Sequence, residues 1–88
     1  MVKWTLVYTR QAQKDARKLS AAGLRRKAGK LLEILKENPY QTLPPFERLR
    51  GDLEGAISRR INIQYRLVYQ ILDDIKTVKV IRMWTHCE

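Results

Sequence analysis

Three side-chain types that acid–base catalysis uses occur in the second half of this chain: a carboxylate, a guanidinium and an imidazole. Glu47 follows a proline-containing stretch, Arg66 lies in a segment typical of a strand, and His86 is near the end. An imidazole titrates near neutral pH and a guanidinium stays charged, so the set could move protons beside a developing negative charge. Each residue also has an ordinary alternative: a solvated loop acid, half of a cross-strand ion pair, and a residue of a frayed tail.

Other common catalytic arrangements are missing from the sequence. Gly51 and Gly55 lack the spacing and the strand-to-helix context of a phosphate-binding loop. The adjacent Asp73 and Asp74 would point to opposite faces of a strand, which favours a turn over a metal site. With a single histidine and a single cysteine, Cys87, the chain cannot form an internal disulfide and has too few ligands for structural zinc. We therefore expect no metal, no other cofactor and a reducing, cytoplasmic environment.

The first half of the chain is predicted to form one strand and two helices. Residues 3–8 are β-branched and aromatic with rough alternation, as in a strand. Thr9 is a suitable N-cap for a helix over residues 10–19, and Gly23 suits the left-handed position after it. Apolar residues between positions 24 and 35 recur at the spacing of one helical face, until Asn38-Pro39 ends a second helix. The short link predicts an antiparallel helical hairpin.

The second half changes to the pattern of strands. Residues 40–45 form a connector, and residues 56–61, 65–72 and 77–84 are three strand candidates joined by links short enough for hairpins. The order predicts an α+β, β-α-α-β-β-β fold of two layers, with an antiparallel meander and the helical hairpin packed on one face. On a regular last strand, Arg82 and His86 would share one face. The length of 88 residues predicts one domain, residues 1–88.

Positive charge dominates the composition. The chain has 18 Lys and Arg against 9 Asp and Glu, a net charge of +9. Such an excess in a folded domain indicates an acidic partner, such as nucleic acid, although solubility alone is the alternative. No apolar stretch is long enough to span a membrane, and the start lacks the apolar core of a signal peptide. The predicted helices carry half of the basic side chains: Arg10, Lys14, Arg17, Lys18, Arg25, Arg26, Lys27, Lys30 and Lys36.

A combination of motifs in the second half resembles the Txe/YoeB group of RelE-type toxins, which are bacterial toxin–antitoxin ribonucleases. The motifs are F-E-R-L-R-G-D-L-E-G over residues 46–55, S-R-R-I over residues 58–61, R-L-V-Y over residues 66–69, and the terminal histidine at position 86. Each motif is weak by itself, whereas the combination is specific. The order of predicted elements over the whole chain is also that of the RelE-like fold.

The resemblance implies a metal-independent endoribonuclease that cuts messenger RNA in the decoding site of the 70S ribosome and is silenced by an acidic antitoxin. Glu47 would take the proton from the ribose 2′-hydroxyl, and His86 would protonate the leaving 5′-oxygen. Arg66 would stabilise the charge on the phosphate, and Arg50 and Arg60 would hold the RNA backbone. The basic helices would dock on ribosomal RNA, and no membrane is involved. The resemblance does not decide whether the protein forms a homodimer.

Two positions need separate comment. Adjacent residues on a strand point to opposite faces, so only one of Arg59 and Arg60 can face the site, and the resemblance favours Arg60. Cys87 stands where the family usually has a tyrosine thought to orient the substrate. A thiol offers no ring and only a weak donor, so reduced activity is expected. Cys87 is kept in the candidate catalytic set because of its position, either as a natural variant or as a substitution that weakens the protein.

Two alternatives come from other functional classes. A protein of the same fold could inhibit a topoisomerase such as gyrase, as the ParE branch does, or could bind nucleic acid without catalysis. A topoisomerase inhibitor needs no acid–base pair, so the set of Glu47, Arg66 and His86 disfavours it. Replacing Glu47 and His86 separates the classes, because an enzyme would lose cleavage while a binding module would be indifferent.

Overall fold

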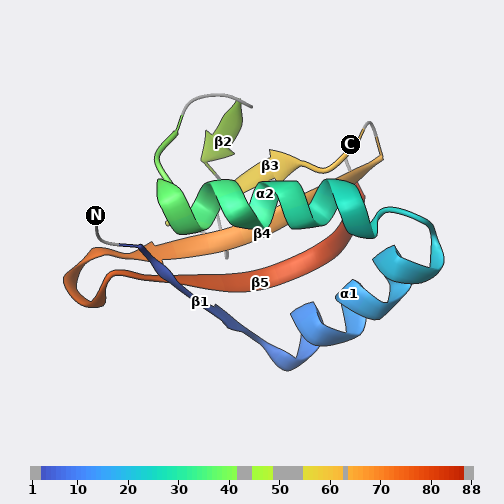
Figure 1. The fold of residues 1–88 in the computed structure, drawn as a ribbon, viewed down its shortest axis with the longest axis horizontal. Coiled ribbons are helices and arrows are strands. Elements are labelled where there is room, and N and C mark those ends of the chain that lie inside the picture. The colour runs from blue at the N-terminus through green and yellow to red at the C-terminus, as the bar shows by residue number, and fades with distance from the viewer. Residues whose placement is uncertain (1–2, 42–44, 49–54, 63, 87–88) are drawn as a thin grey trace.

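The computed structural model describes residues 3–41, 45–48, 55–62 and 64–86, with only the backbone for residues 84–86. The elements run in the order expected of an α+β fold, with one additional short strand (Figure 1). They are β1 (Thr5–Tyr8), α1 (Arg10–Ala21), α2 (Arg25–Glu37), β2 (Phe46–Arg48), β3 (Ala56–Arg60), β4 (Tyr65–Leu72), a 3-10 turn (Asp73–Ile75) and β5 (Thr77–His86).

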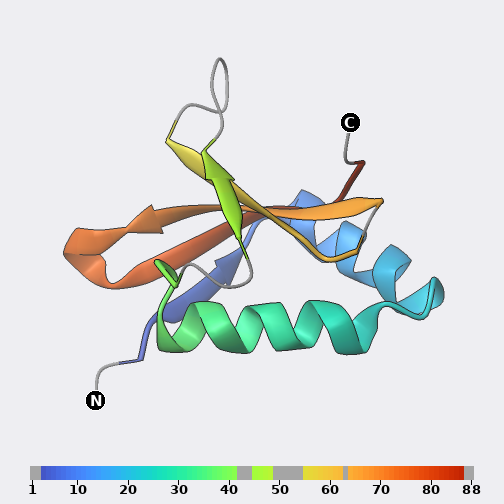
Figure 2. The same ribbon diagram turned by 90° about the horizontal axis from the view of Figure 1, so that it is seen from above.

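The strands form one five-stranded mixed sheet in the order β1-β5-β4-β3-β2. The meander of β3, β4 and β5 is antiparallel, as predicted, and β1 adds to its edge in parallel with β5. Figure 2 shows α2 on one side of the sheet, while the end of β5 turns toward the other side. The α+β prediction of two layers is therefore confirmed, and no helix among the described residues covers the other face of the sheet.

Local sequence signals account for the limits of α1. The Thr9 hydroxyl accepts a hydrogen bond from the Ala12 amide at 3.0 Å, which satisfies one of the free amides of the first turn. The same hydroxyl donates to the Ile81 carbonyl at 2.8 Å and so ties the start of the helix to β5. Gly23, with φ of 76°, takes the left-handed conformation after the helix. The helix continues to Ala21, two residues beyond the predicted end.

The second helix buries the predicted apolar stripe. Ala28, Leu31 and Leu35 are buried on the face of α2 that meets the sheet. The Asn38 amide still donates to the Ile34 carbonyl, at 2.8 Å, and Pro39 follows, so the helix ends where proline prevents its continuation. The link between α1 and α2 is short, yet α1 packs more on β5 than on α2.

Alternation along the strands divides the sheet into a core face, which packs against the helices, and an opposite face, which we call the open face. On β3 and β4, Ile57, Leu67 and Tyr69 join the buried cluster beneath the helices. Their neighbours in sequence, including Ser58 and Arg66, therefore point to the opposite face. Within the part of the chain that the structure describes, no helix is long and apolar enough to cross a membrane.

Several predicted boundaries were wrong. The first strand begins at Thr5 rather than residue 3, because the Trp4 amide bonds to the Lys36 carbonyl of α2 instead of to a strand. Strand β2 falls just after the predicted connector, and it forms because it pairs with β3. β5 extends two residues past the candidate range 77–84 because its last residues still pair with β4, so His86 ends the last strand, as expected. The expected turn at Asp73 and Asp74 is present as a 3-10 turn.

Candidate active site

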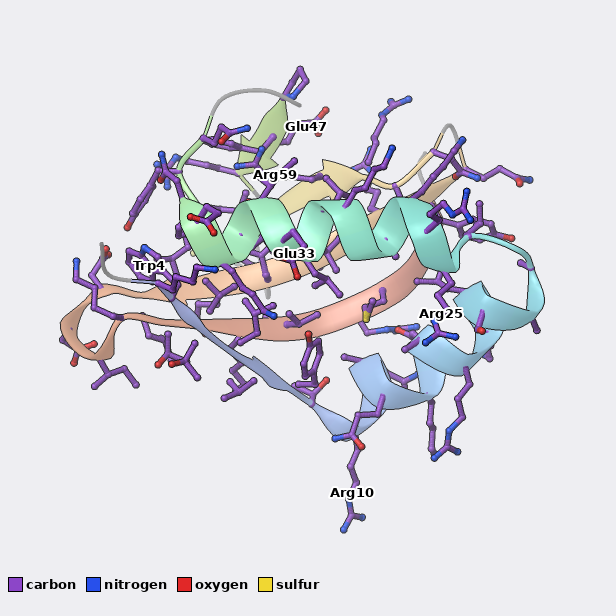
Figure 3. The ribbon with its side chains drawn as sticks, viewed as in Figure 1. Trp4, Arg10, Arg25, Glu33, Glu47 and Arg59 are labelled. Atoms are coloured by element: carbon purple, nitrogen blue, oxygen red, sulfur yellow. The ribbon has the colours of Figure 1, made fainter. Side chains whose placement is uncertain are left out.

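The strand register brings Glu47 and Arg66 to the open face of the sheet. Glu47 on β2 lies opposite Ser58 on β3, and Arg60 on β3 lies opposite Arg66 on β4. Directly opposed residues of antiparallel strands share a face, and residues two apart on one strand do as well. Glu47, Ser58, Arg60 and Arg66 therefore lie on the same face, from three adjacent strands. Figure 3 shows Glu47 at the outer part of the molecule, on β2.

An ion pair joins the two groups that the sequence selected as acid and cation. The Glu47 Oε2 atom lies 3.6 Å from Arg66 Nη1. Their exposure differs sharply: the Glu47 side chain is 65% exposed, whereas the Arg66 side chain is only 16% exposed. The arginine is thus held within the sheet surface while the carboxylate remains open to solvent and to an incoming substrate.

A pocket of about 200 Å³ is centred on this pair and is lined by Pro45, Glu47, Ser58, Arg60 and Arg66. Pockets for complete small ligands usually measure about 300–1,000 Å³. The smaller volume suits one part of a larger substrate, and two guanidinium groups beside one carboxylate give it a net positive lining. Such a lining favours an anionic group, for which arginine can supply two parallel hydrogen bonds.

Ser58 is a pocket residue to which the sequence analysis assigned no role. It is 3% exposed and lies directly opposite Glu47. A signal for it was present, because Ile57, Arg59 and Ile61 alternate with Ser58 and Arg60. Two isoleucines mark the buried side of this strand, so Ser58 had to share the open side with Arg60. The same alternation places Arg59 in the core and Arg60 at the pocket.

The third predicted group, His86, is located by its backbone. His86 is the register partner of Tyr65, and Thr85 is the partner of Arg66. The backbone of His86, the last residue of β5, therefore pairs with β4 one residue away from Arg66. The side chain of His86, and both Arg50 and Cys87, lie outside the described residues, so their assigned roles stay predictions.

The expectation that Arg82 and His86 share a face rested on a regular last strand, and β5 is not regular. Its register with β4 shifts between the partners of Arg66 and Val68 and again between those of Val68 and Tyr69. Arg82 instead donates from Nε to Asp15 Oδ2 on α1, at 2.8 Å. The irregularity removes the regular alternation on which the expectation rested. Because the His86 side chain lies outside the described residues, the expectation itself stays a prediction.

Asp15 anchors this irregular part of β5, and the sequence analysis gave it no role. It is 0% exposed, and besides Arg82 it accepts hydrogen bonds from the Met83 amide at 3.0 Å and Gln11 Nε2 at 3.0 Å. Burial by itself raises the pKa of the Asp15 carboxyl, but the bonds from Arg82, Met83 and Gln11 outweigh it and lower that pKa below the usual value. A charged carboxylate inside the fold thus holds α1 against the strand that ends at His86.

Comparison with known proteins agrees with this architecture. A family model described as "YoeB-like toxin of bacterial type II toxin-antitoxin system" matches residues 6–87. The chain belongs to this YoeB-like toxin family. A YoeB toxin of Streptomyces coelicolor is 37% identical over 49 residues, which cover 56% of this chain and 58% of that protein. The aligned part thus spans less than two thirds of the curated relative.

Solved YoeB structures resemble nearly the whole chain. The YoeB/ParE toxin from Agrobacterium tumefaciens superposes with a TM-score of 0.83 and 29% identity, covering 94% of this chain and 99% of the other. YoeB in the YoeB–YefM complex from Staphylococcus aureus superposes with a TM-score of 0.78 and 26% identity, covering 96% and 98%. The resemblance to YoeB toxins inferred from the motifs is therefore confirmed.

Among the described residues of this YoeB-like toxin, no group of three or more histidine, cysteine, aspartate or glutamate side chains could hold a metal ion. The groups gathered on the open face are instead one carboxylate, one hydroxyl and two guanidinium groups. Their chemistry is that of binding an anion beside a group able to accept a proton.

Proposed function

We propose that this YoeB-like toxin is a metal-independent endoribonuclease that cleaves messenger RNA in the ribosomal decoding site and so inhibits translation. The observation that carries the proposal is the Glu47–Arg66 pair in a pocket that Arg60 also lines. It provides a proton acceptor and two cations at one point, which is what attack on a phosphodiester by its own 2′-hydroxyl requires.

In the proposed reaction the nucleophile is already part of the substrate. Glu47 accepts the proton of the ribose 2′-hydroxyl, and the 2′-oxygen forms a bond to the adjacent phosphorus. The bond from phosphorus to the 5′-oxygen breaks, and His86 gives that oxygen a proton. The products are a 2′,3′-cyclic phosphate and a 5′-hydroxyl. No metal is needed, because the tethered nucleophile removes the entropic cost of bringing two reactants together.

Arg60 and Arg66 would meet the phosphate in this reaction. The two side chains are opposed across β3 and β4, so a phosphate between them would contact both. Charge develops on the phosphate oxygens as the 2′-oxygen adds, and preorganised cations stabilise that charge more than they stabilise the substrate. The dependence on a 2′-hydroxyl predicts cleavage of RNA and not DNA.

Binding to the ribosome is proposed to come from the helices. Phosphate contacts of exposed lysine and arginine make binding to RNA strongly dependent on salt. Such action would place the protein in the cytoplasm. The exposed basic residues of α1 and α2 are Arg10, Lys14, Arg17, Lys18, Arg25, Arg26, Lys27 and Lys30.

An antitoxin partner is proposed on the same grounds. The solved YoeB of Staphylococcus aureus was crystallised with YefM, and another structure is a YoeB dimer. For a chain of net charge +9 the complementary partner is acidic, and a segment disordered when free could fold across the basic surface.

The test is primer extension on a messenger RNA, with and without 70S ribosomes. Glu47→Gln keeps the shape of the side chain but removes the base, so cleavage should fall by about 10²- to 10⁴-fold. Glu33→Gln, an exposed acid on α2, is the matched control and should cut normally. Cys87→Tyr should cut more strongly than the natural chain.

Two results would reject the proposal. One is the absence of cuts by both the natural chain and Cys87→Tyr, with folded protein and active ribosomes. The other is full cleavage by Glu47→Gln. Either result would direct the next assays to topoisomerase inhibition, the alternative that needs no proton acceptor.

A further inference from the structure

Arg59 is a buried arginine that the proposed reaction does not use. It lies on β3 between Ser58 and Arg60 of the pocket, but its side chain points to the core face and the residue is only 1% exposed. In Figure 3 its label lies close to β2, the strand that carries Glu47. Burying a guanidinium is costly unless hydrogen bonds satisfy it, so its contacts indicate what the residue does.

The contacts of Arg59 converge on the segment that leads into β2. Its Nη2 donates to the Pro39 carbonyl at 3.0 Å and to the Gln41 carbonyl, both of which follow the end of α2. Its Nε donates to the Tyr69 hydroxyl at 2.7 Å, which fixes the guanidinium against β4. One side chain therefore joins the sheet to the chain segment after α2.

The same guanidinium also contacts β2 itself. The Arg59 Cζ atom lies 5.0 Å from the centroid of the Phe46 ring, and Phe46 and Arg59 are register partners. This distance is within the range of a cation–π contact. Phe46 directly precedes Glu47, and alternation sends the phenyl ring toward the core and the carboxylate to the pocket.

On the other face of the sheet, β2 is attached by the solvent-exposed Glu47–Arg66 ion pair, and its strand pairing adds little more. Within the described part of the chain it contains three residues and lies at the edge of the sheet, with β3 as its one neighbouring strand. Short edge strands are easily displaced, because one ladder of hydrogen bonds holds them. The Arg59–Phe46 contact and the two carbonyl bonds supply the missing attachment from the core side.

We infer that Arg59 is a positioning residue that holds β2, and through Phe46 sets the distance of Glu47 from the pocket. The consequence for activity rests on the proposed nuclease function. A displacement of about 1 Å at a reacting group can cost about 10²-fold in rate. Lysine would keep the charge but cannot donate in several fixed directions from one planar group, so it cannot replace the arginine here.

The experiment compares Arg59→Lys with the natural chain in steady-state cleavage on ribosomes and in amide hydrogen exchange. Arg59→Lys should lower kcat by about 10- to 100-fold and leave KM within about twofold, because RNA binding by the open face is untouched. The amides of residues 46–48 should exchange at least about tenfold faster, while those of α1 keep their rates.

Leu19→Val is the matched control for lost stability. Leu19 is buried on α1 and has no part in β2, so this variant should lower Tm while cleavage and exchange in β2 stay unchanged. An equal loss of kcat in Leu19→Val and Arg59→Lys at equal Tm would overturn the inference. Unchanged exchange of residues 46–48 in Arg59→Lys would also overturn it.

Tyr69→Phe covers the case in which Arg59→Lys does not fold. It removes the hydroxyl that accepts from Arg59 Nε and donates to the Pro39 carbonyl at 3.5 Å, and it keeps the ring in the core, so it should reproduce both effects at smaller size. Normal cleavage with normal exchange in Tyr69→Phe would then count against the inference. If the natural chain cuts no RNA, the proposed function fails, and exchange in β2 alone decides whether Arg59 holds this strand.

Discussion

Arg60 and Arg66 are direct cross-strand partners, one on β3 and the other on β4. Like charges in this position destabilise an antiparallel pair. Glu47, 3.6 Å from Arg66, offsets part of the repulsion, so the pocket keeps an excess of positive charge in the absence of an anion. The arrangement costs stability, and an anionic substrate held between the two arginines would relieve it.

Arg60→Gln should therefore raise or preserve stability while it weakens binding of RNA. Arg60 is exposed and its charge is screened by solvent, so we expect a gain of at most about 0.5 kcal/mol in the free energy of unfolding, measured by urea denaturation. The slope of log affinity for RNA against log salt concentration should become shallower by about one, as expected for the loss of one phosphate contact. Lys79→Gln, an exposed position on β5, is the control. A clear loss of stability in Arg60→Gln would show that the opposed pair is not repulsive.

Asp15→Asn should destabilise the fold at neutral pH. The amide oxygen can still accept from Arg82 and from the Met83 amide, but without the charge, and the amide NH₂ group would then face the Gln11 side chain, which now donates to this carboxylate. Because Arg82 is partly exposed and can turn to water, we expect a loss of about 1–3 kcal/mol. Asp74→Asn, an exposed change of the same kind, should have almost no effect in the same urea experiment.

The effect of Asp15 should also depend on pH. Its pKa in the folded chain is lower than the ordinary value of 3.8, so the folded state binds this proton less readily than the unfolded state. The stabilisation is then fully present above about pH 5 and is lost as the pH falls through the folded pKa. The difference between the natural chain and Asp15→Asn should accordingly shrink when unfolding is measured at about pH 3 instead of pH 7. A constant difference at both pH values would contradict the assignment.

The Thr9 hydroxyl should stabilise the fold through two hydrogen bonds. Thr9→Val keeps the shape but removes both the acceptor for the Ala12 amide and the donor to the Ile81 carbonyl. The expected loss is about 1–2 kcal/mol in the free energy of unfolding. Thr9→Ser retains the hydroxyl and should stay within about 0.5 kcal/mol of the natural chain. A loss in Thr9→Ser without a loss in Thr9→Val would assign the effect to the methyl group instead and contradict the prediction.

Much of the fold could be predicted because its signals are local. The apolar stripe of α2, the cap at Thr9 and the stop at Asn38-Pro39 each act within a few residues. The Ser58–Arg60 alternation likewise contained enough information to separate the buried Arg59 from the pocket residue Arg60. The β2 strand could not be read in the same way, because a three-residue segment takes its conformation from the β3 strand beside it.

The sequence by itself determined the types of groups at the site, the order of the elements and the family of the chain, since residue identity and short-range periodicity carry these directly. Only the tertiary structure decided that Glu47 meets Arg66, that Asp15 holds the irregular part of β5, and that Arg59 braces the strand of Glu47. These relations join residues from 13 to 68 positions apart. Strand register and bulges set such distances, and both follow from how the whole chain packs around its core.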